Sequence, residues 1–310
     1  LRCRVAEVLR QGQMCIRDVT YIARHFGVSP LMVGFTVVAF GTSLPELVVS
    51  VNANAHDLPG IAIGNVLGSN IANIMLVLGV TGFFTTIIAV PRDLIRDIVL
   101  MLLATAALAG LMVHGYISSI AGFSMVVILV GYTLWGYRQA LTGNVAVEDV
   151  DEPAFSSMAT SLFFLFIGLV FIAVGAEMLV RGAKVSATVI GVPEDVIGLT
   201  VIAIGTSLPE LSTCLIAAHK RQTGIILGNI IGSNVFNILM IIGIMALVKP
   251  IDLSLASPQL VDLDIWVTLS VSFLFTLVLL FYRKVDRIFG ALFLGGYVLY
   301  VLSVFVLYLT

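Results

Sequence analysis

Two copies of the hexapeptide Gly-Thr-Ser-Leu-Pro-Glu, at residues 41–46 and 205–210, carry the residue types most able to do chemistry in this chain. Each copy lies in an apolar segment long enough to cross a bilayer, and each places a carboxylate there, Glu46 and Glu210. A charge at the centre of a bilayer costs at least about 2.5–3.5 kcal/mol, so such residues face a cavity or a partner and mark a pathway. The hexapeptides therefore predict a polar functional site inside the membrane.

The proline of each hexapeptide predicts a break in its helix. Pro45 and Pro209 cannot donate to the carbonyl four residues earlier, so the carbonyls of Gly41 and Gly205 lose their usual helical partner. Each break also offers hydroxyl groups, from Thr42 and Ser43 in the first copy and from Thr206 and Ser207 in the second. Carboxylates, hydroxyls and carbonyls are the oxygen ligands that a hard cation such as Ca²⁺ collects, six to eight at a time.

Serine and asparagine recur in the helices that follow. Ser69 and Asn73 are four residues apart, as are Ser233 and Asn237, and residues at this spacing share a helix face. No histidine or cysteine joins the set, and oxygen-only ligands favour Ca²⁺, Na⁺ or Mg²⁺ over zinc or copper. The plainer interpretations are that lone hydroxyls bond to their own backbone and that glycines such as Gly64 and Gly68 serve close helix packing. Asn70 and Asn234 fit interhelical bonding and ion binding equally well.

Composition places these motifs in an all-α polytopic membrane protein. Of the 310 residues 59% are hydrophobic and 11% are charged, against roughly 25% charged residues in soluble domains. Short alternating segments of a β-barrel are absent from the sequence. Nine apolar spans are predicted, at 31–54, 61–89, 95–113, 117–137, 157–180, 194–218, 223–248, 262–282 and 286–308.

The chain contains an internal duplication. An offset of 164 residues aligns 27–79 with 191–243 without a gap, and 24 of the 53 aligned positions are identical. The shared residues include both hexapeptides and the later Gly-Asn and Gly-Ser-Asn motifs. Chance does not produce such a match, so the two halves are predicted to be structural repeats.

Residues 1–18 do not fit the repeat. They contain four arginines and no apolar run, and the offset sets them opposite a predicted helix. We expect a non-native or unstructured leader, with the first helix of the first repeat missing or replaced. The full design would be two five-helix repeats, ten helices in all with nine seen, and an odd number of spans inverts the second copy. The predicted divisions are the leader at 1–18, a first half at 19–137, an acidic linker at 138–156 and a second half at 157–310.

The distribution of basic residues predicts the orientation in the membrane. If the linker is cytoplasmic, nine Lys and Arg residues outside the leader share its side and three lie opposite, which fits the positive-inside tendency. The first group is Arg24, Arg92, Arg96, Arg138, Lys220, Arg221, Arg283, Lys284 and Arg287, and the second is Arg181, Lys184 and Lys249. The carboxyl terminus would then lie outside.

The motifs of both repeats resemble those of the calcium/cation antiporter superfamily, specifically its sodium/calcium exchanger-like bacterial and archaeal branch. Each repeat carries Gly-Thr-Ser-Leu-Pro-Glu followed by Gly-Asn-x-x-Gly-Ser-Asn-x-x-Asn, and the resemblance covers about residues 19–310. It implies ten transmembrane helices in two inverted five-helix repeats, with ions bound where the broken helices cross.

The resemblance also implies roles for individual residues. Glu46 and Glu210 would be central ligands shared by Ca²⁺ and Na⁺, and Asn73 and Asn237 would complete that central site. Some family members carry aspartate at the position of Asn237, so the Na⁺ stoichiometry, K⁺ involvement and H⁺ coupling stay open. The whole predicted metal-binding set is Ala39, Thr42, Ser43, Glu46, Ser69 and Asn73 with Ala203, Thr206, Ser207, Glu210, Ser233 and Asn237; within it the alanines would offer carbonyls and Ser69 and Ser233 hydroxyls to outer Na⁺ sites.

These observations predict a secondary antiporter, not an enzyme, that exchanges Ca²⁺ for Na⁺ or H⁺ across the cytoplasmic membrane by alternating access. A cation/proton or K⁺-linked exchanger of the same fold and a passive cation channel are the alternatives. A hydrolase using Ser43 or Ser207 is disfavoured because no membrane-embedded histidine or lysine could serve as its base. The expected partners are the transported ions Ca²⁺ and Na⁺, with H⁺ or K⁺ left open, and the bilayer; no cofactor, nucleic acid or obligate protein partner is expected.

Overall fold

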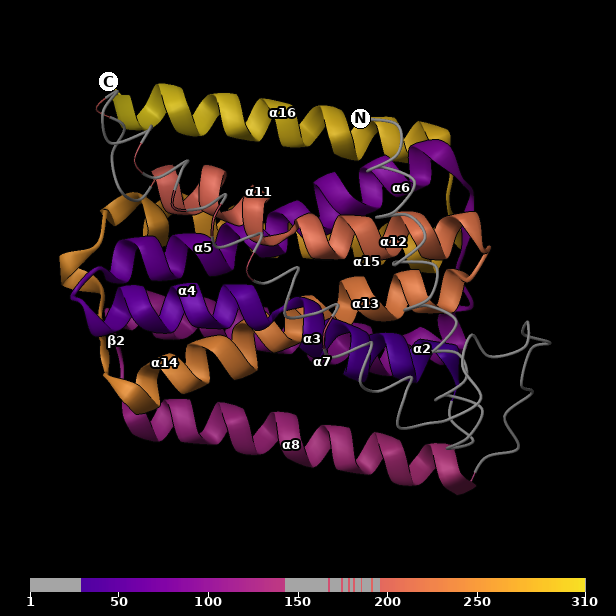
Figure 1. Ribbon diagram of the computed structural model, residues 1–310, viewed down its shortest axis with the longest axis horizontal. Helices are drawn as coiled ribbons and strands as arrows, with labels where there is room; N and C mark the ends of the chain where they lie inside the picture. Colours follow the sequence, from indigo (N-terminus) through magenta and orange to yellow (C-terminus); the bar gives the residue numbers. More distant parts are fainter. Residues whose placement is uncertain are drawn as a thin grey trace.

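The computed structural model describes residues 29–142 and 196–309, with the single positions Ile167, Val174, Met178, Arg181, Val185 and Gly191. These residues form a helical bundle joined by two short two-stranded sheets (Figure 1). The first repeat comprises α2 (Pro30–Val33), η1 (Gly34–Val38), α3 (Ala39–Thr42), α4 (Leu44–Ala55), α5 (Pro59–Ala72), η2 (Asn73–Val77), α6 (Leu78–Phe84), β1 (Ile87–Ile88), α7 (Pro91–His114), β2 (Tyr116–Ile117) and α8 (Ser119–Thr142). The second comprises η3 (Ile197–Ile202), α11 (Ala203–Thr206), α12 (Leu208–His219), α13 (Thr223–Phe236), η4 (Asn237–Ile242), α14 (Gly243–Val248), β3 (Ile251–Asp252), η5 (Leu253–Leu255), η6 (Leu260–Asp264), α15 (Ile265–Leu277), η7 (Val278–Tyr282), β4 (Lys284–Val285) and α16 (Arg287–Leu309).

The described helices confirm the predicted all-helical membrane architecture. Six of them are long and apolar enough to cross a bilayer, or eight if each of two bent pairs is one span. These eight correspond to eight of the nine predicted spans. The ninth, at 157–180, is described only at Ile167, Val174 and Met178, and the predicted leader at 1–18 lies outside the described residues. Two predicted boundaries differ. The span predicted to reach residue 89 ends at Phe84, because Thr85 is extended and leads into β1, and α8 continues to Thr142, inside the predicted linker.

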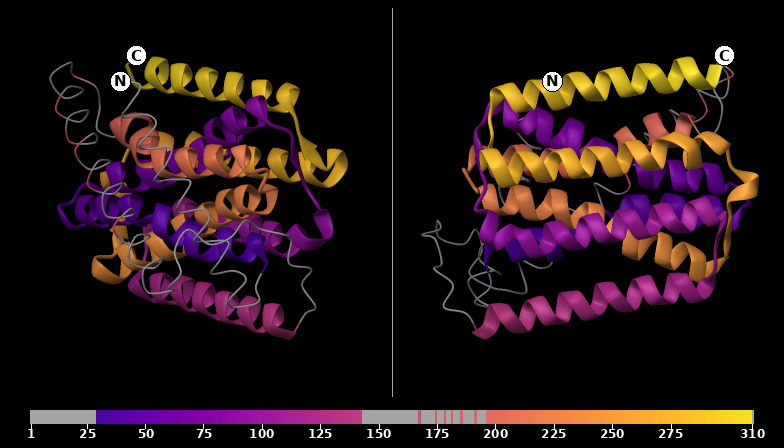
Figure 2. Two further views of the ribbon diagram at one scale, coloured as in Figure 1. Left: turned by 45° about the vertical axis from the view of Figure 1, so that its right-hand side comes forward. Right: turned by 180° about the vertical axis from the view of Figure 1, so that it is seen from behind.

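The two repeats run in opposite senses through the molecule. In Figure 1, α4 of the first repeat lies in the left half of the bundle and its equivalent α12 of the second repeat lies in the right half. Likewise α6 of the first repeat lies on the right, and its equivalent α14 lies on the left. The outermost helix of each repeat packs on the other repeat: α16 covers α6, and α8 covers α14. Both views in Figure 2 show α8 and α16 on opposite outer edges of the bundle. The inverted arrangement therefore brings equivalent residues of both repeats to one central crossing.

Two small sheets tie loops of the two repeats together at the ends of the helices. Ile87 pairs with Val285 in one sheet, and Tyr116 pairs with Asp252 in the other, both antiparallel. The first sheet joins segments on the side that the charge analysis assigned to the linker, and the second joins segments on the opposite side. This grouping agrees with the predicted topology of the loops.

The central helices approach each other at glycines. A Cβ added to Gly68 would lie 2.4 Å from the carbonyl oxygen of Leu199, and one added to Gly232 would lie 2.5 Å from that of Phe35. Leu199 and Phe35 are themselves related by the 164-residue offset. The same close approach therefore occurs twice, between α5 and η3 and between α13 and η1, and only a residue without a side chain fits it.

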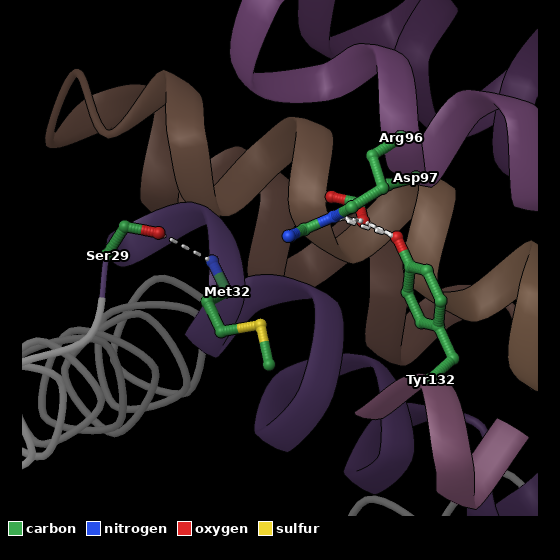
Figure 3. A network of polar contacts seen from close by, with 5 residues as sticks. All are labelled: Ser29, Met32, Arg96, Asp97 and Tyr132. Carbon is green, nitrogen blue, oxygen red and sulfur yellow. Dashed lines mark hydrogen bonds and ion pairs between the residues drawn. The ribbon is translucent and has the colours of Figure 1, made fainter. Parts of the chain in front are cut away.

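A buried aspartate and a tyrosine join the peripheral helices of each repeat. In the first repeat the Tyr132 hydroxyl donates to Asp97 Oδ1, and the Arg96 guanidinium approaches both residues (Figure 3). In the second repeat the Tyr300 hydroxyl donates to Asp264 Oδ1 at 3.0 Å. Because a buried carboxylate without a donor is costly, these contacts hold α7 to α8 and the η6–α15 span to α16.

Candidate ion-binding site

The two hexapeptides form the bends that the prolines predicted. The helix axis turns by 44° between α3 and α4 and by 41° between α11 and α12. The residues at the bends, Ser43 and Ser207, have nearly identical backbone angles, with φ −83° and ψ 2° in the first and φ −81° and ψ 1° in the second. The same local sequence therefore builds the same broken helix in each repeat.

Each break places a glutamate in the first turn of a new helix. Glu46 lies in the first turn of α4 and Glu210 in the first turn of α12, and both side chains are fully buried. The positive end of the helix dipole favours a carboxylate at this position. Asn65 links the two segments, because its Oδ1 accepts from Thr206 Oγ1, four residues before Glu210, and its Nδ2 donates to Glu46 O at 3.4 Å. Two negative groups thus share one buried region.

Hydroxyl groups of one repeat reach the site from the other. Thr206 Oγ1 lies 3.4 Å from Ser69 Oγ and donates at 3.3 Å to Asn65 Oδ1. In the mirrored position, Thr42 Oγ1 donates at 3.3 Å to Asn229 Oδ1. Within the second repeat, Ser233 Oγ donates at 3.4 Å to Glu210 Oε1. These contacts interleave the residues of the two predicted half-sites.

The unpartnered polar atoms are concentrated in this region. Among the described residues, nine buried side-chain polar atoms have no hydrogen-bond partner, and seven of the nine belong to the predicted metal-binding set. All seven are oxygens, and we call them the oxygen cluster: Ser43 Oγ, Glu46 Oε1 and Oε2, Asn73 Oδ1, Ser207 Oγ, Glu210 Oε2 and Asn237 Oδ1. Buried polar side chains nearly always have a partner. A group of acceptors that includes two carboxylates can be satisfied by a cation.

The alanine carbonyls of the predicted set are partly engaged. Ala39 O accepts the Ser43 N–H at 3.0 Å, and Ala203 O accepts the Ser207 N–H at the same distance. A carbonyl oxygen has two lone pairs, and the second faces a threonine hydroxyl in each repeat: Thr42 Oγ1 lies 3.4 Å from Ala39 O, and Thr206 Oγ1 lies 3.4 Å from Ala203 O. Both alanines are fully buried and each follows a π-helical segment, η1 or η3. Asn73 and Asn237 likewise begin the π-helical segments η2 and η4, and such segments are frequent at functional sites.

Sequence reasoning missed a layer of residues behind the carboxylates. Asn65 Nδ2 donates to Ser50 Oγ at 2.9 Å, and Asn229 Nδ2 donates to Cys214 Sγ at 3.4 Å. Ser50 and Cys214 occupy equivalent positions of the repeats, so the Cys214 sulfur accepts the hydrogen bond that the Ser50 hydroxyl accepts in the first repeat. The Gly-Asn motif in both repeats was the available signal for Asn65 and Asn229. These contacts orient each asparagine oxygen toward the threonine of the opposite repeat.

The arrangement can bind a hard cation and offers little for other chemistry. The described residues contain no group of three or more His, Cys, Asp or Glu side chains that would suit a transition metal. The hydroxyls of Ser43 and Ser207 contact no base in the described part of the chain, so neither is activated as a nucleophile. The site is a set of carboxylate, amide and hydroxyl oxygens at the crossing of two broken helices.

Comparison with known proteins gives a family match over nearly the whole chain. The family model described as sodium/calcium exchanger protein matches residues 12–138 and 160–306. The Inner membrane protein YrbG of Escherichia coli (strain K12) is 34% identical over 303 residues, covering 94% of this chain and 92% of that protein. The Sodium/calcium exchanger MaX1 of Methanosarcina acetivorans is 42% identical over 87 residues, which cover 28% of this chain and 25% of that protein.

Solved structures agree with the sequence matches. A structure of the sodium-calcium exchanger NCX_Mj, soaked with Na⁺ and Ca²⁺, superposes with a TM-score of 0.77 at 34% sequence identity. The match covers 96% of this chain and 95% of that structure. The likeness therefore extends over both repeats.

Proposed function

This chain belongs to the sodium/calcium exchanger protein family, and we propose that it exchanges Ca²⁺ for Na⁺ across the cytoplasmic membrane through the oxygen cluster. Family membership and the apolar helices support a multi-pass membrane transporter rather than an enzyme. The linker would face the cytoplasm and the carboxyl terminus the outside, as the distribution of basic residues favours.

The observation that carries this proposal is the oxygen cluster itself. Seven buried oxygens that have no hydrogen-bond partner among the described residues, from two carboxylates, two amides and two hydroxyls, lie on equivalent elements of the two repeats. Ca²⁺ binds six to eight oxygens at about 2.3–2.6 Å, and two carboxylates balance the charge of one divalent cation. Na⁺ uses the same kinds of oxygen ligand, so either ion suits the site.

Competition for shared ligands explains how exchange would be coupled. If Ca²⁺ and Na⁺ both require Glu46 and Glu210, occupancy by one ion excludes the other. An inverted repeat also has two related conformations, in which the halves exchange roles and the site opens to one side or the other. A carrier of this kind moves one ion inward only when another moves outward.

Calcium flux in vesicles under imposed gradients tests the proposal and identifies the coupling ion. We expect a Na⁺ gradient alone to drive ⁴⁵Ca²⁺ uptake into proteoliposomes that contain the purified chain, with K⁺ and pH gradients held at zero in that arm. Uptake driven only by a pH or K⁺ gradient would replace Na⁺ by H⁺ or K⁺ as the counter-ion. Calcium flux that persists without any counter-ion gradient would contradict exchange and indicate a channel.

A further inference from the structure

Four asparagines form a chain of amide contacts beside the oxygen cluster. Asn73 Nδ2 donates to Asn234 Oδ1 at 3.2 Å, and Asn237 Nδ2 donates to Asn70 Oδ1 at 3.0 Å. Both contacts join the two repeats, and the 164-residue offset relates one to the other. All four side chains are buried. The Gly-Ser-Asn-x-x-Asn motif of each repeat therefore contributes one amide to each contact.

A neighbouring group that can only accept hydrogen bonds determines which way the amides of Asn70 and Asn237 point. Asn70 Nδ2 donates at 3.4 Å to the backbone carbonyl of Asn234, which can only accept. The NH₂ group of Asn70 is therefore directed at that carbonyl, and its oxygen is left for Asn237. Asn237 must answer with its NH₂ group, which leaves Asn237 Oδ1 as a buried oxygen without a partner in the described structure.

The amides of Asn234 and Asn73 are oriented by a different acceptor. Asn234 Nδ2 approaches the thioether sulfur of Met101 on α7 at 3.9 Å, and a thioether also only accepts. Asn234 therefore presents its oxygen to Asn73, which answers with its NH₂ group. Asn73 Oδ1 is left without a hydrogen-bond partner in the part of the chain that the structure describes. The side-chain amides thus point the same way in both halves of the site, although a backbone carbonyl sets the direction in one half and a thioether sulfur sets it in the other.

We propose that Asn70 and Asn234 are positioning residues that hold the Asn73 and Asn237 side chains with their oxygens toward the ion. This inference rests on the proposed function. A reversed amide would present two N–H donors to the cation, so its orientation decides between attraction and repulsion. Partners behind the ligands of a metal site commonly fix ligand orientation, and their loss costs about 10–100-fold in metal affinity.

Equilibrium ⁴⁵Ca²⁺ binding to the purified full chain tests the inference. Asn70→Leu removes the acceptor that orients Asn237, and we expect at least about tenfold weaker Ca²⁺ binding. The matched control is Asn54→Leu, because Asn54 is also a buried asparagine that joins the repeats, and within the described structure its amide donates to Met245 O and Lys249 O rather than to a predicted ligand. The control is expected to lower the thermal stability and to keep the Ca²⁺ affinity within about twofold of the wild type.

A second background separates positioning from a loss of structure. In Asn237→Asp both outer side-chain atoms of residue 237 are oxygens, so the orientation of that side chain no longer matters. Adding Asn70→Leu to Asn237→Asp should therefore cost less than about threefold in Ca²⁺ affinity. An equal loss in both backgrounds, or no loss in either, overturns the inference.

Met101→Leu gives a test that does not depend on the stability of Asn70→Leu. It removes only the acceptor for Asn234 and nearly conserves side-chain volume, and we expect about threefold weaker Ca²⁺ binding. Unchanged affinity would overturn the assignment for Asn234. Wild-type protein that binds no Ca²⁺ would instead overturn the proposed function, so the two failures are distinguishable.

Discussion

Replacing Gly68 by alanine is expected to force the two repeats apart beside the proposed ion-binding site. A Cβ at this position would lie 2.4 Å from Leu199 O and 2.7 Å from Ala203 Cβ, whereas ordinary contact begins at 3.4 Å. Neither neighbour can move away by changing a rotamer, because one is a backbone atom and the other is a Cβ. The helix α5 must therefore retreat from η3 by about 1 Å, which is the difference between the required and available distances.

This displacement has two measurable consequences. Overpacking of this kind costs about 1–3 kcal/mol of folding free energy. The residue after Gly68 is Ser69, whose hydroxyl lies 3.4 Å from Thr206 Oγ1 in the opposite repeat, so a shift of α5 also separates the two half-sites. We expect Ca²⁺ binding to weaken at least about tenfold, which corresponds to about 1.4 kcal/mol.

The assay is thermal unfolding of the purified protein with and without Ca²⁺. Gly232→Ala should reproduce the effect, because its Cβ would lie 2.5 Å from Phe35 O. The controls are Gly110→Ala and Gly131→Ala, where an added Cβ meets no atom of the described residues within 4 Å; neither should lower the stability or the Ca²⁺-induced shift in Tm. If Gly68→Ala unfolds at the same temperature as these controls and shows the same Ca²⁺-induced shift, the packing argument is wrong.

Three further predictions concern the surrounding structure. Tyr132→Phe and Tyr300→Phe each remove a donor from a buried aspartate, so each should cost about 1–3 kcal/mol of stability in thermal unfolding while Ca²⁺ affinity stays unchanged; equal stability of wild type and variants would show that these contacts do not hold the outer helices. Cys214→Ser should keep wild-type stability because the other repeat has serine in the same contact, whereas Cys214→Val leaves an amide without an acceptor and should cost about 1–3 kcal/mol; equal stability of both variants would contradict this. In a cysteine-free background, Asp252→Cys should react with a membrane-impermeant maleimide in intact cells and Asp286→Cys only after permeabilisation, and the reverse pattern would invert the proposed topology.

The two helix breaks and their buried glutamates could be predicted from the sequence because both copies of the motif are locally complete. Proline at position 45 or 209 breaks the helix wherever the segment lies, and the adjacent glutamate is then set in the first turn of a new helix. The exact repeat of these residues shows which carboxylates are equivalent. Their location at one crossing follows from the inversion, which the count of spans and the charge distribution already indicated.

The amide contacts could not be predicted in the same way. Asn70 and Asn73 belong to one motif, yet each pairs with an asparagine of the opposite repeat. Spacing along a helix identifies a shared face but does not identify the residue that faces it from another helix. The choice between interhelical bonding and ion binding for Asn70 therefore required the geometry of the crossing.

The two aspartate–tyrosine pairs were missed because the offset between the repeats changes. The ungapped alignment uses 164 residues, whereas Asp97 corresponds to Asp264 at 167 and Tyr132 to Tyr300 at 168. Small length differences in the loops thus concealed the equivalence. An alignment that allowed gaps would have paired Pro91 with Pro258, and the dipeptide Asp97-Ile98 with Asp264-Ile265.

The claim that Ca²⁺ and Na⁺ share two carboxylates is tested most directly by Na⁺-gradient-driven ⁴⁵Ca²⁺ uptake into proteoliposomes containing Glu46→Gln or Glu210→Gln. Glutamine keeps the size of the side chain but removes one of the two charges that balance a divalent ion. We expect either substitution to abolish uptake, with wild-type protein and Asn54→Leu as active references. Undiminished uptake by either glutamine variant would contradict the shared-ligand account.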